Sequence, residues 1–222
     1  SVPKCAVGSF NITTVAAGNT VSVSGLAFQP KAVVFWWTQR TESVDTSDAT
    51  TDGQKGFGYM VSGTDRRACT AQSEDASAAA DCDSLTVANA CIIALTIGGV
   101  LEGSADFSAF GDTSFTIVID DAFAVNRRIC YMALGGDDLT VTVGGTIVEP
   151  GATGNQTVTA TGLTTDGSDQ CVLFFSGLGV TLGTVVVDSS LMVGAAAGST
   201  IVNAVVTGAY DNVADPTNSV RN

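Results

Sequence analysis

The feature that most constrains this chain is a strand-turn-strand unit that occurs twice. Residues 18–26 alternate polar and apolar side chains, and residues 29–38 then form a nearly continuous apolar run, QPKAVVFWWT. The same order returns in GNQTVTATGL at 154–163 and QCVLFFS at 170–176. Alternation is typical of a strand with one buried face, and a short apolar run is typical of a strand buried on both faces. The repeat therefore predicts internal duplication of a β unit.

The composition agrees with an all-β fold. The chain has 25 glycines, many Thr, Ser and Val residues, and no long helix-forming run. With 45% hydrophobic and only 14% charged residues, it has ample material for a buried core. We predict an all-β protein, an antiparallel β-sandwich of jelly-roll-like type, internally duplicated with an incomplete second copy.

The repeat also predicts the domain boundaries: an N-terminal arm at 1–6, a first β-sandwich copy at 7–145 and a partial second copy at 146–222. Four equivalences align the copies: Gly25 with Gly162, Val33 with Val172, Met60 with Met192, and Asp75 with Asp211. The second copy lacks counterparts of residues 91–134, and half a sandwich would expose strand edges. It would borrow strands from a partner, pack on the first copy, or belong to a longer natural chain; we favour the first or third option.

Local patterns predict individual elements. Residues 32–38 form a central strand with Trp36 and Trp37 on opposite faces, and the polar residues 39–54 form an exposed loop. Residues 106–111 form a turn, and 127–134 and 139–143 form alternating strands. Residues 73–84 fit either a loop or a short helix.

Residues 18–36, GNTVSVSGLAFQPKAVVFW, resemble an opening common in uncharacterised virion-associated proteins of tailed bacteriophages. There the pattern TGxQxVxGxGFQPKAVLFW is followed by a polar loop, a GFG element and a closing YLALGG; this chain has GFG at 56–58 and YMALGG at 131–136. The second copy keeps GNQTV and VLFF, but residues 164–169 replace the Phe-Pro turn and the closing ALGG is missing. The resemblance covers most of 7–136 and part of 146–215. It implies a structural part of the particle, either capsid decoration or tail-associated, and carries over no catalytic residue.

Charge and the absence of histidine exclude several functions. The net charge is −13 with only nine Lys and Arg residues, so a nucleic-acid partner held by its phosphates is not expected. No apolar run approaches the length of a membrane span, so no membrane partner is expected. Without histidine, Ser-His-Asp and Cys-His catalytic arrangements are excluded. We predict that the chain is not an enzyme.

The carboxylate pairs Asp81/Asp83, Asp120/Asp121 and Asp137/Asp138 are interpreted as solvated turn residues, because neighbours on a strand point to opposite faces. No cofactor is expected. If a cation binds, it would be calcium, and the group to test is Asp106, Asp112, Asp120 and Asp121.

Six cysteines leave two interpretations open, three disulfides or buried free thiols. No pair has the spacing of a zinc site. If disulfides form, the expected pairs are Cys69–Cys82 and Cys91–Cys130, and Cys5 in the arm could reach another subunit.

Four aromatic residues are candidates for an interface: Trp36, Trp37, Phe57 and Tyr59. Side chains of this type fill cores and subunit interfaces, and exposed pairs of them also stack on sugars. Together with the resemblance, they predict a non-enzymatic virion structural protein of a tailed phage that assembles on or reinforces the capsid (decoration or cement) or tail lattice. Its partners would be other virion proteins and further copies of itself. It would be assembled in the host cytoplasm and then be extracellular in the virion. The alternative is a carbohydrate-binding or receptor-binding adhesion module.

Overall fold

The fold is known from a computed structural model, which describes residues 2–13, 15–39, 52–74, 81–144, 147, 170–179, 181–197, 201–209 and 211. The predicted strand at 154–163 and the equivalence of Asp75 with Asp211 depend on residues outside this set. Most of the predicted loop at 39–54 and the middle of the segment 73–84 also lie outside it.

The described residues form fourteen β-strands and no helix, which confirms the all-β, sandwich-like prediction. The strands make three antiparallel sheets. The seven-stranded sheet contains, in spatial order, β1 (Lys4–Ile12), β10 (Arg127–Gly135), β3 (Pro30–Thr38), β4 (Gly53–Met60), β5 (Arg66–Ser73), β6 (Cys82–Val87) and β12 (Val186–Val187). The four-stranded sheet contains β2 (Thr20–Ser24), β9 (Ser114–Asp121), β8 (Leu101–Gly111) and β7 (Ile92–Leu95). The three-stranded sheet contains β11 (Cys171–Gly177), β13 (Ser189–Ala197) and β14 (Ile201–Ala209).

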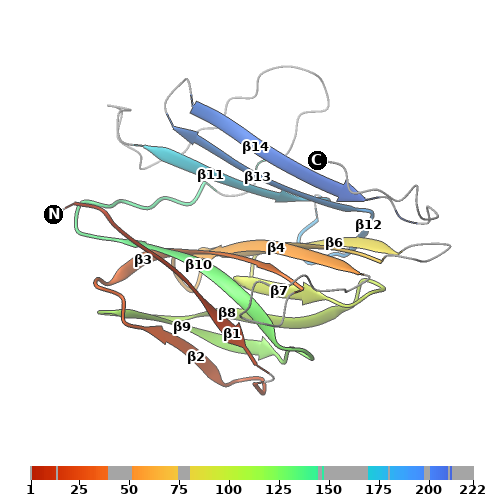
Figure 1. The fold of residues 1–222 in the computed structure, drawn as a ribbon, viewed down its shortest axis with the longest axis horizontal. Coiled ribbons are helices and arrows are strands. Elements are labelled where there is room, and N and C mark those ends of the chain that lie inside the picture. Colours follow the sequence, from red (N-terminus) through yellow and green to blue (C-terminus); the bar gives the residue numbers. More distant parts are fainter. Residues whose placement is uncertain are drawn as a thin grey trace.

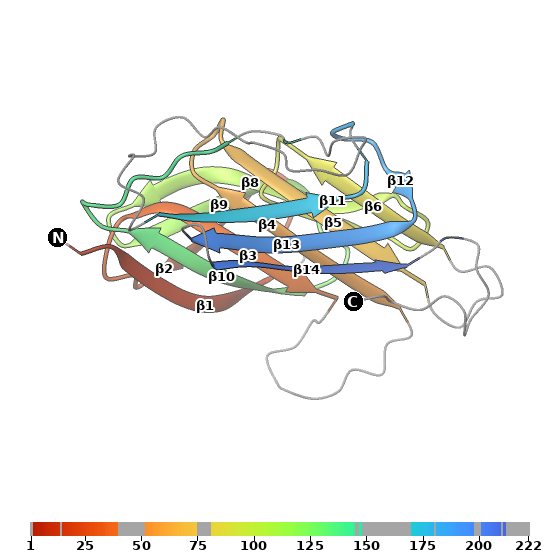
Figure 2. The same ribbon diagram turned by 90° about the horizontal axis from the view of Figure 1, so that it is seen from above.

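The sheets are stacked in three layers, with the seven-stranded sheet between the other two (Figure 1). Seen from above, the strands of the three-stranded sheet cross those of the seven-stranded sheet at an angle (Figure 2). We call the side of the seven-stranded sheet that faces the four-stranded sheet its inner face, and the opposite side its outer face.

The main core lies on the inner face, and strand alternation explains which residues fill it. In β10, Ile129, Tyr131 and Ala133 are buried, while the residues between them are half-buried on the outer face. Phe35 and Phe115 from facing sheets meet edge to face with ring centroids 5.8 Å apart. Burying one such side chain stabilises the fold by about 1.5–3 kcal/mol, so this interface accounts for much of the hydrophobic stabilisation.

The strand order of β3-β4-β5 recurs in β11-β13-β14, as expected for duplicated units. Phe35 lies opposite Gly58, which lies opposite Ala68, and Phe174, Gly194 and Ala204 occupy the same relation in the other meander. This register makes Gly58 equivalent to Gly194, so the equivalence of Met60 with Met192 is displaced by four residues. The division of the chain into two domains stays a prediction.

The three-stranded sheet packs on the seven-stranded sheet of the same chain, the option that the sequence favoured least. β12 pairs with β6, and Ser84 Oγ both donates to the Asp188 carbonyl at 3.2 Å and accepts from the Ser190 amide at 3.1 Å. Leu191 packs against Cys69 and Ala71 on the outer face.

Three local predictions are wrong. Residues 4–6 of the expected N-terminal arm belong to β1, because they pair with the end of β10. The expected turn at 106–111 is the second half of β8, and the turn follows at residues 112–113. Residues 139–143 alternate as a strand would, but they are not part of any strand or sheet among the described residues.

Candidate functional site

The outer face of the seven-stranded sheet carries the aromatic residues that the sequence singled out. Two rows cross this face in register. One contains Ser9, Cys130, Trp36, Phe57 and Cys69; the next contains Val7, Met132, Val34, Tyr59 and Arg67. Trp36, Phe57 and Tyr59 therefore lie side by side, and we call them the aromatic patch.

Phe57 joins the patch to the third layer. Its ring stacks on Phe175 of β11, with centroids 5.7 Å apart and planes 25° apart. Trp36 lies directly opposite Phe57 and is 36% exposed. The patch thus runs from a covered edge under the three-stranded sheet to an open edge at Trp36.

Trp37 does not belong to the patch, which corrects its place among the interface candidates. It points into the main core and is 3% exposed. Its ring lies against Gly56, where any side chain would overlap it. The opposite orientation of Trp36 and Trp37 was correctly predicted, and Trp37 is the tryptophan that fills the core.

Tyr59 lies at the edge of the patch beside Arg67, its cross-strand neighbour. Burial raises the pKa of the Tyr59 phenol, while the charge of Arg67 and a hydrogen bond with it act in the opposite direction. The hydroxyl therefore stays neutral at pH 7, and the ring presents a polar edge beside an apolar face.

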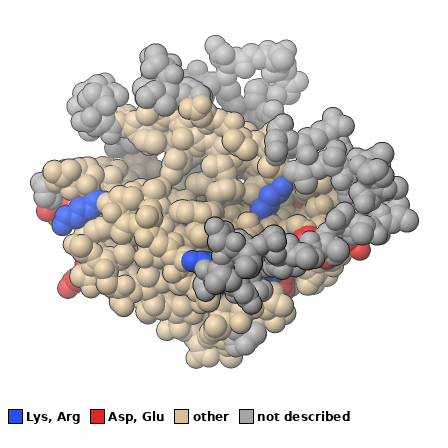
Figure 3. All heavy atoms as spheres, viewed as in Figure 1, with Lys and Arg blue, Asp and Glu red and all other residues tan. Residues whose placement is uncertain are grey.

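Apolar side chains continue from the patch across β10 and β1. Met132, Leu134 and Cys130 are half-buried on the outer face, and Val7 at the edge is 71% exposed. In the third layer, Val205 is 64% exposed. Figure 3 views the layers from their edge, and on that side only scattered Lys, Arg, Asp and Glu residues appear among the described ones. Exposed apolar side chains that adjoin an aromatic patch are typical of an interaction site.

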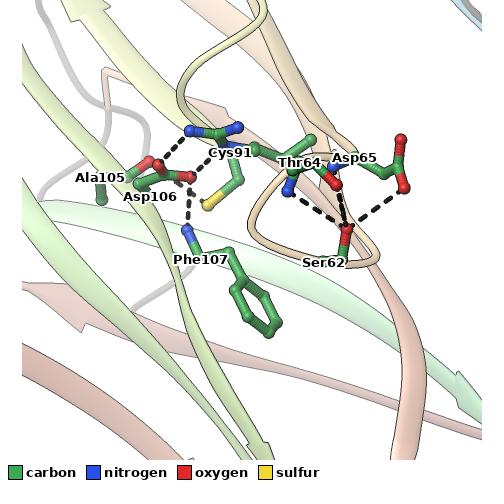
Figure 4. Close-up of polar contacts among 8 residues, drawn as sticks. Ser62, Thr64, Asp65, Cys91, Ala105, Asp106 and Phe107 are labelled. Atoms are coloured by element: carbon green, nitrogen blue, oxygen red, sulfur yellow. Dashed lines mark hydrogen bonds and ion pairs between the residues drawn. The ribbon is translucent and has the colours of Figure 1, made fainter.

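The four carboxylates of the expected calcium group are not brought together. Asp106 pairs in a bidentate manner with Arg66, at 2.8 and 2.7 Å, and also accepts from the Phe107 amide (Figure 4). Asp112 lies in the β8–β9 turn, whereas Asp120 and Asp121 lie at the opposite end of β9. Burial and the charge of Asp106 raise the pKa of Asp120, and Arg66 opposes this. In the described part of the chain, no group of three or more His, Cys, Asp or Glu residues is arranged to hold a metal ion.

The expected disulfides are not formed, because none of the six cysteines is part of a disulfide. Cys69 lies opposite Thr86 and Cys82 lies opposite Ser73, so these two cysteines are offset along neighbouring strands. Cys91 is buried in the main core and donates its thiol hydrogen to the Ala105 carbonyl (Figure 4), whereas Cys130 is on the outer face. Burial raises the pKa of Cys69 to about 12, so its thiol is inert at neutral pH.

The buried charged groups were missed at the sequence level. Arg127 and Glu102 form an ion pair with side chains only 3% and 9% exposed. Asp83 is 5% exposed and was wrongly interpreted as a solvated turn residue. The signal was available, because Asp81 and Asp83 are two positions apart and side chains at i and i+2 share a face of a strand.

Comparisons with known proteins do not identify the chain. No family model, curated protein or solved structure matches it. Among the described residues, none forms a helix that could cross a membrane.

Proposed function

We propose that this chain is a non-enzymatic structural protein of a tailed-phage virion. It would assemble on or reinforce the capsid or tail lattice, with other virion proteins and further copies of itself as partners. Support comes from the phage-like strand pattern of residues 18–36 and from the exposed apolar part of the outer face beside β3. The protein would be assembled in the host cytoplasm and persist outside the cell within the particle.

The aromatic patch with its apolar surroundings is the observation that carries this proposal. Protein interfaces are enriched in Trp, Tyr, Phe and Met at their centres and depleted in charged residues. Trp36 has the features of an anchor: a large ring, partly exposed, with half-buried apolar neighbours on both adjacent strands. The net charge of −13 disfavours a nucleic-acid partner.

Self-association of the purified chain tests the proposal. We expect wild-type protein to form a defined oligomer in light scattering, and Trp36→Ser to weaken it by at least about 2 kcal/mol, roughly 30-fold in the dissociation constant. Val125→Ser removes a comparably exposed apolar side chain from the β9–β10 loop and should leave the oligomer unchanged. A wild-type chain that stays monomeric at high concentration, or equal behaviour of both variants, would contradict assembly through this face.

A carbohydrate-binding module remains the alternative, because aromatic residues share one face with Arg67. A sugar-stacking site of this type needs at least two aromatic faces exposed together. Trp36 provides one exposed face, whereas Phe57 and Tyr59 are half-buried, so the patch meets this requirement only in part. Binding to a glycan array that is lost in Trp36→Ser, in a protein that is monomeric, would favour this alternative over a lattice protein.

A further inference from the structure

A buried row of polar side chains crosses the inner face of the seven-stranded sheet beside the β7–β8 turn. Gln54 of β4 lies opposite Gln72 of β5, and Gln72 lies opposite Asp83 of β6. All three side chains are more than nine-tenths buried, and Gln72 is only 1% exposed. Polar groups at this depth require partners, because burial removes their bonds to water.

The glutamine amides are only half satisfied. Gln72 Nε2 donates to Asp83 Oδ2 at 2.8 Å, and Gln54 Nε2 donates to the carbonyl of Leu95. The Oε1 atoms of both glutamines are buried and have no hydrogen-bond partner among the described residues. A buried oxygen of this kind is destabilising unless a hydrogen-bond donor or a cation reaches it.

Asp81 adds a second carboxylate beside Asp83. Burial, a hydrogen bond with Asp83 and the negative charges of Asp83 and Asp211 all raise the pKa of Asp81. Within the described residues, neither Asp81 nor Asp83 has an ion-pair partner; the pairs Arg66–Asp106 and Arg127–Glu102 lie elsewhere. Two adjacent carboxylates without a basic partner repel each other, and a cation between them would relieve that repulsion.

The β7–β8 turn fits closely over this group. Gly98 and Gly99 have φ angles of +92° and +70°, which favour glycine. A Cβ atom on Gly99 would lie 2.7 Å from Asp83 Oδ2. Only backbone can therefore pack against the carboxylate here.

We propose that Asp81, Asp83 and Gln72 bind a calcium ion, with Gln54 as the adjoining amide. The donors are all oxygens, which calcium accepts from carboxylates, amide carbonyls and water in irregular geometry, whereas zinc prefers nitrogen and sulfur. A half-turn of the Gln72 amide exchanges Nε2 and Oε1. This rotation places the amide oxygen near the present position of Nε2 and therefore close to Asp83 Oδ2. Two oxygens that bind the same cation lie next to each other in this way. The two carboxylates alone supply too few oxygen ligands for calcium, so the glutamine oxygens complete the set of ligands.

Thermal unfolding of the full chain in EDTA, in calcium and in magnesium tests the site, together with calorimetric titration of calcium. We expect calcium at about 1 mM to raise the unfolding temperature by binding one site, and magnesium to do so much less. Asp83→Asn should weaken calcium binding at least about tenfold and raise the unfolding temperature in EDTA, because it removes repulsion between two acids. Asp81→Asn, at a more exposed position, should lose calcium binding in the same way and serves if Asp83→Asn does not fold.

Asp112→Asn is the matched control, since it removes one exposed carboxylate in the β8–β9 turn and should keep the full response to calcium. Equal stabilisation by calcium and magnesium would show that the ions only screen the net charge of −13. That result, an unchanged response in Asp81→Asn, or no response of the wild-type chain would each overturn the assignment.

Discussion

Arg127 carries a buried positive charge, and its side chain has a single partner among the described residues. Glu102 accepts from Nη2, while Nε and Nη1 have no partner among the described residues. Burial lowers the pKa of Arg127, and the charge of Glu102 opposes that shift. We expect Glu102→Leu to cost about 3–5 kcal/mol in urea unfolding, since it leaves an unpaired buried charge. The double variant with Arg127→Met should recover most of this loss, and Arg128→Met, at the half-buried neighbour, should cost far less. A double variant as unstable as Glu102→Leu would contradict this account.

The three-stranded sheet is attached to the seven-stranded sheet through a hydrophobic cluster, in addition to the β12–β6 pairing and the hydrogen bonds of Ser84. In this cluster Phe175 stacks on Phe57, and Leu191 packs beside it. We expect Phe175→Ala to weaken this attachment by about 1–2 kcal/mol, because it removes an aromatic pair and its buried area. Hydrogen exchange should then rise in β11, β13 and β14 while β3 and β10 stay protected. Leu173→Ala, two residues away on the same side of β11 and 39% exposed, is the control. A uniform rise in all three sheets would instead mean that the layers unfold together.

A strand could be predicted when the pattern that indicates it lies within its own residues, and not when it depends on pairing with a distant strand. Alternation and apolar runs correctly indicated β3 and β10 and the opposite orientations of Trp36 and Trp37. The second half of β8 was misread as a turn because Asp106 looks out of place in a strand, and its partner Arg66 comes from β5. Gln54 was assigned to a loop, and its burial follows from pairing with Gln72. The aromatic patch was only partly predicted. Which aromatic residues share a face depends on the register between strands, and composition carries no information on register.

For the whole molecule, the free thiols give the most direct check of the architecture. Cys5 and Cys171 are exposed, Cys130 is half-buried, and Cys69, Cys82 and Cys91 are buried. We expect a thiol reagent to modify Cys5 and Cys171 rapidly in native protein and all six cysteines after unfolding without reductant. Reductant should leave the unfolding temperature unchanged. Fewer than six reactive thiols in the unfolded, unreduced chain would reveal a disulfide and a different arrangement of strands.

The pairing of β1 with β10 has a consequence for how the chain folds. Lys4 lies opposite Gly135, so β1 finds the sheet neighbour that the structure describes only far along the chain. Closing so long a loop costs entropy before any contact repays it, and sheets with many distant pairings fold in milliseconds to seconds rather than microseconds. Until β10 is made, β1 lacks the strand partner that the structure describes, and the edge of β3 that pairs with β10 stays open. A nascent chain of this type is exposed to aggregation during that interval, and rapid completion of synthesis protects it.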